Sequence, residues 1–309
     1  MASTLRLGTR TSRLAVWQAE YVAEALRRAW PGLEVDLVPF VTQGDKTLDQ
    51  PLPEIGGKGL FTAELEASLL DGRIDLAVHS LKDLPTDDPD GLTVGATTER
   101  EDVRDAWICP GGHALADLPP GATVGTSSLR RGAQLLHQRP DLVIRSIRGN
   151  VETRIRKVRE EAYDAGVLAL AGLTRLEIED QAHSMLDLDT MLPAPGQAAL
   201  GVQVRADGGE AARAVAALDH AETRASVTAE RAFLSGLGGG CSAPIAALAE
   251  VHGGRLHLRG RVVSTDGART VEVEADGGFD PGDALACGRA LGLEAASNAL
   301  SQGARDLLP

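Results

Sequence analysis

The stretch Ile74-Asp-Leu-Ala-Val-His-Ser-Leu-Lys-Asp-Leu-Pro85 decides the fold class of this 309-residue chain. Its first five residues form a short, mostly apolar run, which is typical of a strand buried on both faces of a parallel sheet. The polar residues from His79 onward emerge at the carboxyl end of that strand, where open α/β sheets place their binding sites. The stretch therefore predicts a parallel sheet with a functional loop at its edge.

Strands and helices alternate on both sides of this stretch. Periodicity predicts a first group of elements: strands at 5–8, 33–41 and 92–96, and helices at 12–30 and from a glycine loop to about 70. It predicts a second group: strands at 122–125, 142–147 and 166–170, and helices at 128–138 and 150–162. Two consecutive α/β units predict two lobes with mainly parallel sheets and a ligand between them.

The last third of the chain has a different pattern. Residues 199–204 look like a strand that returns to the first lobe, and a helix at 223–237 follows. Strands at 245–251, 255–263 and 270–274 and a helix at 281–300 then predict a small α+β domain.

Composition and charge exclude several classes of protein. The net charge of -13 argues against nucleic acid or an anionic membrane surface as the main partner. No apolar run approaches the roughly 18 residues of a membrane span, and the N-terminus lacks a secretory signal pattern. We therefore expect a soluble, cytoplasmic protein.

Three cysteines are present, and none forms a C-x-x-C pair. Cys109 and Cys287 stand among apolar residues and are expected to be buried core thiols. His252 and His257, taken as one strand, would point to opposite faces, so no metal site is expected. Cys241 follows three glycines, which would leave its sulfur accessible and give a bulky group room. The simpler alternative is a small residue that fills a loop.

Basic residues concentrate in one part of this acidic chain. Residues 123–175 hold ten basic and five acidic side chains, a formal +5, and arginines outnumber lysines 27 to 4. Arginine suits bidentate recognition of carboxylates or phosphates. The sequence therefore predicts an anion site in the second lobe.

Three predicted strand-to-helix junctions carry hydroxyl groups and arginines. They are Thr9-Arg10-Thr-Ser12, Gly125-Thr-Ser-Ser-Leu-Arg-Arg131 and Arg148-Gly-Asn-Val-Glu-Thr-Arg154. Helix N-termini bind anions, although Ser127 or Ser128 could equally act as a simple helix cap with the arginines in water. Locally, Asp83 is most simply a turn former. Three basic strand ends in two lobes nevertheless favour a ligand with several carboxylates between them.

Together these stretches resemble the porphobilinogen deaminase family, also called hydroxymethylbilane synthases. The matching segments, in chain order, are Leu7–Gln18, Gly57–Phe61, Ala77–Pro85, Gly125–Arg131, Ile147–Asn150, Ala171–Leu173, Pro193–Gln197, Glu230–Phe233 and Gly239–Cys241. Two positions depart from the family pattern: Val103 stands where proline is expected, and Ala198 where glycine is common.

The resemblance implies a function and a cofactor. Members join four porphobilinogen molecules head to tail with loss of ammonia, then release hydroxymethylbilane by hydrolysis. A dipyrromethane cofactor, attached through a thioether to the cysteine matching Cys241, is the primer, and Asp83 matches the catalytic carboxylate. The remaining matches bind substrate or cofactor: Arg10, Ser12, Lys58, Ser80, Lys82, Thr126, Ser127, Ser128, Arg130, Arg131, Arg148, Arg154 and Arg175.

The resemblance also implies two lobes like those of periplasmic binding proteins and a small α+β domain that carries the cofactor cysteine. The expected ranges are 1–98 with 197–218, then 99–196, then 219–309. We expect a monomer without metal. Two other functions fit the same residues: a non-catalytic two-lobed binding protein for a small polycarboxylate, and a cysteine-dependent transferase or hydrolase acting on an acidic substrate.

Overall fold

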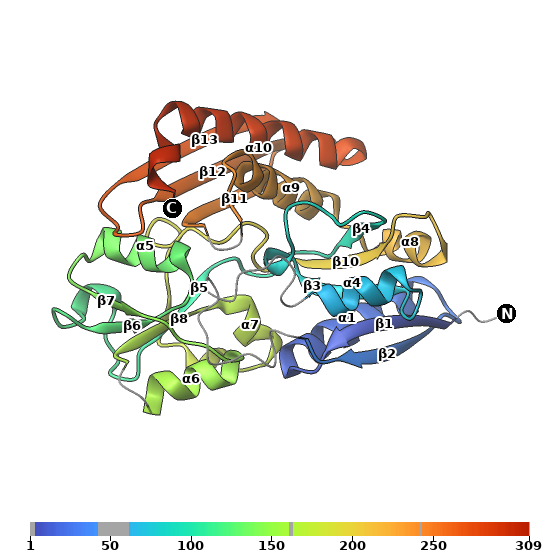
Figure 1. Ribbon diagram of the computed structural model, residues 1–309, viewed down its shortest axis with the longest axis horizontal. Helices are drawn as coiled ribbons and strands as arrows, with labels where there is room; N and C mark the ends of the chain where they lie inside the picture. The colour runs from blue at the N-terminus through green and yellow to red at the C-terminus, as the bar shows by residue number, and fades with distance from the viewer. Residues whose placement is uncertain (1–3, 43–61, 161–162, 241–242, 309) are drawn as a thin grey trace.

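The computed structural model describes residues 4–42, 62–160, 163–240 and 243–308. Its strands form three sheets, two of five strands and one of three. The two five-stranded sheets lie side by side, and the three-stranded sheet with its two long helices lies above them (Figure 1). This confirms the expected fold class of two α/β lobes, whose sheets are mainly parallel in strand direction, and a small α+β unit.

The first sheet has the order β2-β1-β3-β10-β4. Its strands are β1 (Thr4–Arg10), β2 (Glu34–Phe40), β3 (Leu76–Ser80), β4 (Leu92–Thr97) and β10 (Leu200–Arg205). β10 runs antiparallel between β3 and β4, so the chain returns to this sheet after building the second one. β2 and β3 are both parallel neighbours of β1.

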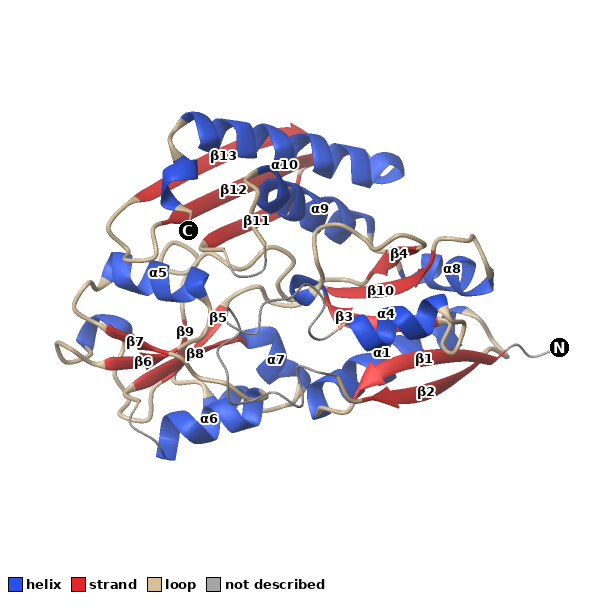
Figure 2. Ribbon diagram, viewed as in Figure 1, coloured by secondary structure: helices blue, strands red, loops and turns tan. Residues whose placement is uncertain are grey.

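Helices cover both faces of the first sheet (Figure 2). They are α1 (Arg13–Ala29), α4 (Ala63–Leu70) and α8 (Glu210–Val215). Alternate residues of β3 point to opposite faces: Leu76 packs with α1 and α8, whereas Ala77 packs with Leu65 and Leu69 of α4. This two-sided burial explains why the strand is apolar without a polar alternation.

The second sheet has the order β7-β6-β8-β5-β9. Its strands are β5 (Asp105–Ile108), β6 (Thr123–Gly125), β7 (Val143–Arg145), β8 (Ala165–Ala169) and β9 (Ser184–Met185), and its helices are α5 (Leu129–Gln138), α6 (Val151–Glu160) and α7 (Leu170–Arg175). β5, β9 and α7 were absent from the sequence-based expectation, as was α8. β5 lies between β8 and β9 and is buried on both faces: Trp107 packs on α5, and Ile108 packs on α6.

The third sheet, β11 (Ile245–His252), β12 (Arg255–Val263) and β13 (Thr270–Gly278), is an antiparallel meander. Helices α9 (Ala221–Gly236) and α10 (Ala284–Ser301) pack on one face of it. The two helices approach closely because glycines face backbone: a Cβ at Gly288 or Gly292 would collide with the carbonyl oxygen of Ala225 or Ala229.

The chain crosses between the lobes twice, and one buried carboxylate holds both crossings. Glu230 on α9 has no exposed surface and receives two hydrogen bonds from Arg100, at 2.7 and 2.9 Å, in the first crossing. It also accepts from the backbone N–H of Gly196, in the second crossing, at 2.7 Å, and from that of Ala249 at 2.8 Å. Helix α9 therefore fastens the crossings to the third sheet.

Two expectations about cysteine and histidine are wrong. Cys109 is buried as expected, but Cys287 is only half-buried, because it lies at the edge of the stripe of α10 that contacts α9. His252 and His257 do not share a strand. They lie on β11 and β12 across a glycine turn, on one face, with ring centroids 6.2 Å apart.

Candidate functional site

The site lies where strands of the two lobes end toward each other. Ser80 ends β3, and its hydroxyl accepts a hydrogen bond from Gln18 of α1 at 2.9 Å. Arg10 ends β1, and Ser12 caps α1 by accepting from the N–H of Ala15 at 3.4 Å. The junction residues of the first lobe therefore lie together, as expected from parallel strand ends.

Asp83 closes a short 3₁₀ turn, Leu81–Asp83, after β3. Its side chain is exposed, whereas Leu81 and Leu84 on either side are 1% and 3% exposed. Arg231 of α9 reaches over and donates hydrogen bonds to the carbonyl oxygens of Leu84, at 3.1 Å, and Pro85. Two buried leucines and a guanidinium thus hold an exposed carboxylate at a fixed place.

The junction 126–128 mainly organises its own loop. Ser128 is the N-cap of α5 and accepts from the N–H of Arg131 at 3.4 Å, and Thr126 accepts from the N–H of Ser128 at 3.1 Å. The hydroxyl of Ser127 donates to the carbonyl of Ile147 at 2.8 Å and accepts from its N–H at 3.1 Å. The capping role is therefore present for Ser128.

Arg130 and Arg131 are not in water. They are 4% and 6% exposed, and both donate to Asp105, which has no exposed surface. Arg131 binds this carboxylate through two nitrogens at 3.0 and 2.7 Å, and Arg130 binds it at 2.9 Å. Although burial raises the pKa of Asp105, the guanidinium groups of Arg131 and Arg130 hold it well below its usual range.

Asp105 was missed in the sequence. An aspartate at the start of a short strand gives no local signal that it is buried, because its burial depends on two arginines 25 and 26 residues away. The available signal was its place in Arg100-Glu-Asp-Val-Arg-Asp105, an unusually charged run beside an apolar strand.

Charges from both lobes act on one another across the site. Burial lowers the pKa of Lys82 to about 8, and the positive charges of Arg131 and Arg130 lower it further, against the opposite effect of Asp83 and Asp105. Lys82 belongs to the first lobe and Arg130 and Arg131 to the second. These residues are therefore close in space.

Arg154, on the second lobe, is also affected by the charges of Arg131 and Asp83. Its Nε donates to the carbonyl of Gly149 at 2.7 Å. Burial lowers its pKa to about 10, with a further decrease from Arg131 and Arg148 and an increase from Asp83. Asp83 thus interacts with cations of both lobes.

Arg175 ends α7 and lies between the lobes. Its side chain is buried, and it donates to the carbonyl of Ala198 at 2.6 Å. Its guanidinium carbon lies 5.8 Å from the ring centroid of Trp17. Burial lowers the pKa of Arg175 to about 10.

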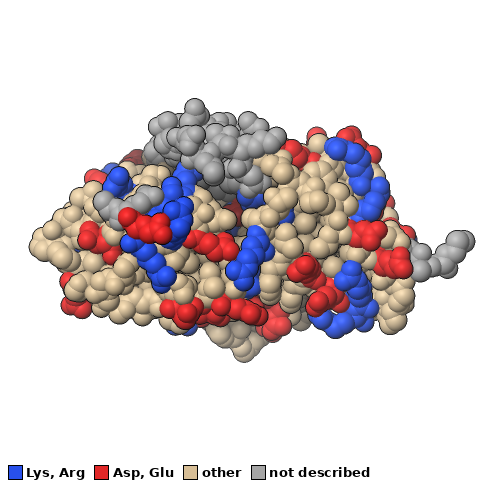
Figure 3. Space-filling model, turned by 90° about the horizontal axis from the view of Figure 1, so that it is seen from below, with Lys and Arg blue, Asp and Glu red and all other residues tan. Residues whose placement is uncertain are grey.

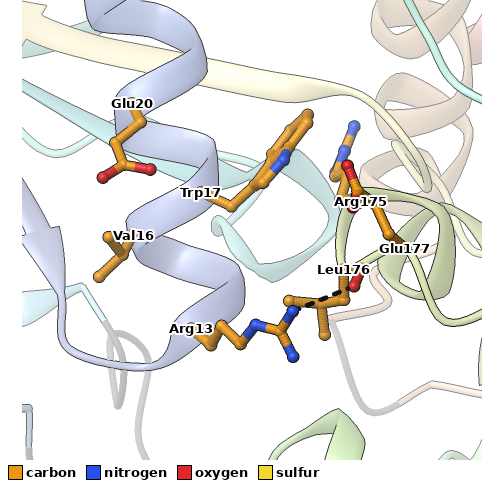
Figure 4. Close-up of a pocket in the computed structure, with 7 residues that line it drawn as sticks. All are labelled: Arg13, Val16, Trp17, Glu20, Arg175, Leu176 and Glu177. Atoms are coloured by element: carbon orange, nitrogen blue, oxygen red, sulfur yellow. Dashed lines mark hydrogen bonds between the residues drawn. The ribbon is translucent and has the colours of Figure 1, made fainter.

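A pocket of 350 Å³ opens beside this contact, between α1 and the end of α7 (Figure 4). Arg13 spans it and donates to the carbonyl of Leu176 at 3.3 Å. Trp17 and Arg175 form one wall in the view of Figure 4. The pocket shows that the lobes meet here through a few side chains rather than through a continuous core.

Two predicted site residues, Lys58 and Cys241, lie outside the described residues. The other predicted site residues are divided between the two lobes. The first-lobe group is Arg10, Ser12, Ser80, Lys82 and Asp83, and the second-lobe group is Thr126, Ser127, Ser128, Arg130, Arg131, Arg148, Arg154 and Arg175.

These residues fit a ligand with several carboxylates. Burial first, and neighbouring positive charges next, lower the pKa of Lys82 and of Arg154, so a bound anion would favour the charged form of each side chain. Among the described residues, the buried Nε atoms of Arg130 and Arg175 also have no hydrogen-bond partner. On the face seen in Figure 3, by contrast, basic and acidic side chains alternate.

The fold and the site define a two-lobed α/β protein whose site includes the buried side chains of Arg130, Arg131 and Arg175. Two family models match the chain: "Porphobilinogen deaminase, dipyromethane cofactor binding domain" over residues 5–213 and "Porphobilinogen deaminase, C-terminal domain" over residues 225–297. A porphobilinogen deaminase of Syntrophotalea carbinolica is 49% identical over 307 residues, which cover 99% of this chain and 96% of the relative. The chain belongs to the porphobilinogen deaminase family.

Some solved structures are similar to this chain at low sequence identity. The methionine-binding protein MetQ is 16% identical over 69% of this chain and 88% of its own, with a TM-score of 0.44. A YaeC-family lipoprotein from Enterococcus faecalis V583 is 12% identical over 70% of this chain and 91% of its own, with a TM-score of 0.43. At these scores the similarities add nothing to the functional assignment.

Family membership establishes the reaction and the cofactor. The protein is a transferase of tetrapyrrole biosynthesis that condenses porphobilinogen head to tail into hydroxymethylbilane on a dipyrromethane primer. The match over nearly the whole chain favours this activity over the alternative of a non-catalytic binding protein. No helix in the described part of the chain is both long and apolar enough to span a membrane.

Proposed function

We propose that Asp83 is the catalytic carboxylate of this transferase. The observation that carries the proposal is the place of Asp83: it lies in the matched Ala77–Pro85 segment, exposed at the end of the turn that follows β3 and that Arg231 contacts. A carboxylate between the lobes can help protonate the amine that leaves porphobilinogen, offset positive charge on the pyrrole, and accept the proton lost after the carbon–carbon bond forms. Its exposure lets it reach the substrate, and the contacts of Arg231 keep its turn in place.

The remaining site residues bind carboxylates. Each pyrrole bears an acetate and a propionate, so a ligand of several rings carries many negative charges. Bidentate guanidinium groups suit them, and helix N-termini add N–H donors. The proposed set is Arg10, Ser12, Lys58, Ser80, Lys82, Thr126, Ser127, Ser128, Arg130, Arg131, Arg148, Arg154 and Arg175.

Cys241 is proposed as the attachment residue of the dipyrromethane, through a thioether. The support is its place in the matched Gly239-Gly-Cys241 segment, which begins three residues after the end of α9 at Gly236. When bound, the cofactor supplies the pyrrole carbon to which the first substrate is joined. The chain's own part is to anchor it at one sulfur and to hold its carboxylates between the lobes.

Three domains are proposed: residues 1–98 with 197–218, residues 99–196, and residues 219–309. The place of β10 between β3 and β4 supports the discontinuous first domain. The separate antiparallel meander supports the third. We also propose that the protein is a cytoplasmic monomer and does not bind nucleic acid. The net charge of -13 supports the monomeric state and the absence of nucleic-acid binding.

Mass spectrometry of the intact, active protein tests the proposal. The expected mass exceeds that of the sequence by two linked pyrrole units, and the peptide that contains Cys241 carries the difference. An active preparation whose Cys241 reacts fully with an alkylating reagent contradicts the attachment and favours a free cysteine nucleophile.

A further inference from the structure

A buried amide joins the cations of the two lobes. Gln197 lies in the second crossing and has no exposed surface. Its Nε2 donates to the carboxylate of Asp105 at 2.8 Å and to the carbonyl of Val103 at 2.7 Å. Its Oε1 accepts from the ammonium of Lys82 at 3.3 Å. The side chain therefore contacts a carboxylate of one lobe and an ammonium of the other.

The carboxylate at one end of this contact already holds two guanidinium groups. Asp105 receives Arg130 and Arg131, at distances from 2.7 to 3.0 Å. The positions of three cations therefore depend on one another: Arg130 and Arg131 through Asp105, and Lys82 through Gln197 and Asp105.

Few side chains other than glutamine could make this connection. A primary amide donates through nitrogen and accepts through oxygen, so it can satisfy a carboxylate and an ammonium at once without adding charge. A glutamate would place a second carboxylate against Asp105, and an apolar residue would leave buried polar groups unsatisfied. The chemistry of the contact thus explains the residue type.

We propose that Gln197 is a positioning residue for the reaction: it fixes the Lys82 ammonium relative to Arg130 and Arg131 by acting through Asp105. This inference rests on the proposed role of Lys82 in substrate binding. Its consequence is that carboxylates held by the second lobe and a substrate held at Lys82, beside Asp83, keep a constant separation. Asp105 is the shared fixed point of that arrangement.

The test compares Gln197→Met, Gln197→Glu and the surface control Gln138→Met in the holoenzyme. Gln197→Met keeps the volume but loses both polar contacts. It should retain the cofactor mass, because Asp105 still holds both arginines, and lower kcat by about tenfold or more with a smaller change in KM. Gln138 is exposed at the end of α5, and its variant should match the wild type.

Gln197→Glu changes the pH dependence of activity, which would stay unchanged if Gln197 only stabilised the fold. A carboxylate beside Lys82 raises the pKa of the ammonium, so the alkaline limb of the activity profile should shift to higher pH by about one unit or more. An unmoved alkaline limb in this variant overturns the proposal, as does unchanged kcat in Gln197→Met.

A measurement on the wild-type holoenzyme covers the case in which a variant does not fold. The chain has four lysines, so the pH dependence of acetylation can be followed peptide by peptide with Lys157 as reference. Lys82 should react with a midpoint near pH 8, well below that of Lys157. A normal midpoint for Lys82 would show that its ammonium is not buried beside Arg130 and Arg131, and would overturn the positioning role.

The inference and the proposed function fail in different ways. If Lys82→Met lowers turnover but the Gln197 variants do not, only the positioning role is lost. If Lys82→Met and Asp83→Asn both leave turnover unchanged, the proposed site itself is wrong.

Discussion

The guanidinium of Arg231 donates a hydrogen bond to the carbonyl oxygen of Leu84 at 3.1 Å, one residue beyond Asp83. Arg231 lies on α9, next to Glu230, which holds both crossings between the lobes. One turn of α9 therefore contacts both the loop that follows Asp83 and the two crossings between the lobes. The position of the Asp83 carboxylate therefore depends on α9.

Loss of Arg231 should misplace Asp83. In Arg231→Met, the carbonyls of Leu84 and Pro85 lose their donor, so we expect turnover to fall about tenfold while the cofactor mass remains. Arg231→Lys, which keeps a donor, should recover part of the rate. Steady-state kinetics with intact mass measures both, and a Met variant with wild-type kcat contradicts the role.

Replacement of Asp83 should remove catalysis without removing the fold. Asp83→Asn keeps the size of an exposed side chain, so the thermal midpoint should change little. Turnover should fall by about a hundredfold or more, because one amide cannot exchange the protons that a carboxylate does. Release of ammonia from porphobilinogen is the measurement. Near-normal release would exclude Asp83 as the catalytic residue.

Cys241→Ser should carry no extra mass and should melt at a lower temperature than the wild type. The physical reason is that clustered guanidinium groups repel one another when no carboxylates offset them. Cys287→Ser is the matched control, because Cys287 is only half-buried, and this variant should keep the added mass. Equal melting temperatures for Cys241→Ser and the wild type would contradict the electrostatic part of the argument.

The pKa of Lys82, lowered from 10.5 to about 8, predicts opposite effects of pH on activity and stability. Activity that needs the ammonium should decline as pH rises through about 8. For stability the sign is reversed: the fold disfavours the charged form, so this group's contribution improves between about pH 8 and 10.5, where the unfolded chain stays protonated. Activity profiles and thermal unfolding of wild type and Lys82→Met separate the two effects.

Ala198 has a left-handed backbone, with φ of 71°, in the second crossing. That conformation costs a non-glycine residue roughly 1–2 kcal/mol. Ala198→Gly removes this cost, but the greater freedom of glycine in the unfolded chain lowers stability by about 0.4–1 kcal/mol. We therefore expect the free energy of unfolding to increase by about 0.5–1 kcal/mol and Tm to rise by about 2 °C. Calorimetry checks this, and a lower Tm would show that the alanine methyl contributes packing that outweighs the strain.

Much of the fold could be predicted because two-sided burial makes parallel strands apolar. The runs that became β3 and β8 showed this directly. β5 escaped prediction because its pairing partners, β8 and β9, are antiparallel and distant in the sequence. α7 escaped because it follows β8 without any intervening residue, and the capping signal is missing.

The site was predictable only as a set of separate strand ends. Arg130 was found because it lies at a basic strand-to-helix junction, whereas Asp83 was found only through the family resemblance. Asp105 and Gln197 were not, because their roles come from contacts made across 25 to 115 residues of chain. Burial of a charged side chain is a property of its three-dimensional surroundings, and no local pattern encodes it.

The insertion of β10 between β3 and β4 has a consequence for synthesis on the ribosome. The first sheet lacks β10, the strand that joins β3 to β4, until residue 205 has been translated, whereas the second sheet can complete its pairing once residue 185 has emerged. The nascent N-terminal segment therefore waits, partly assembled, while the lobe encoded after it finishes first. The order of maturation along this polypeptide is thus the reverse of its order of translation.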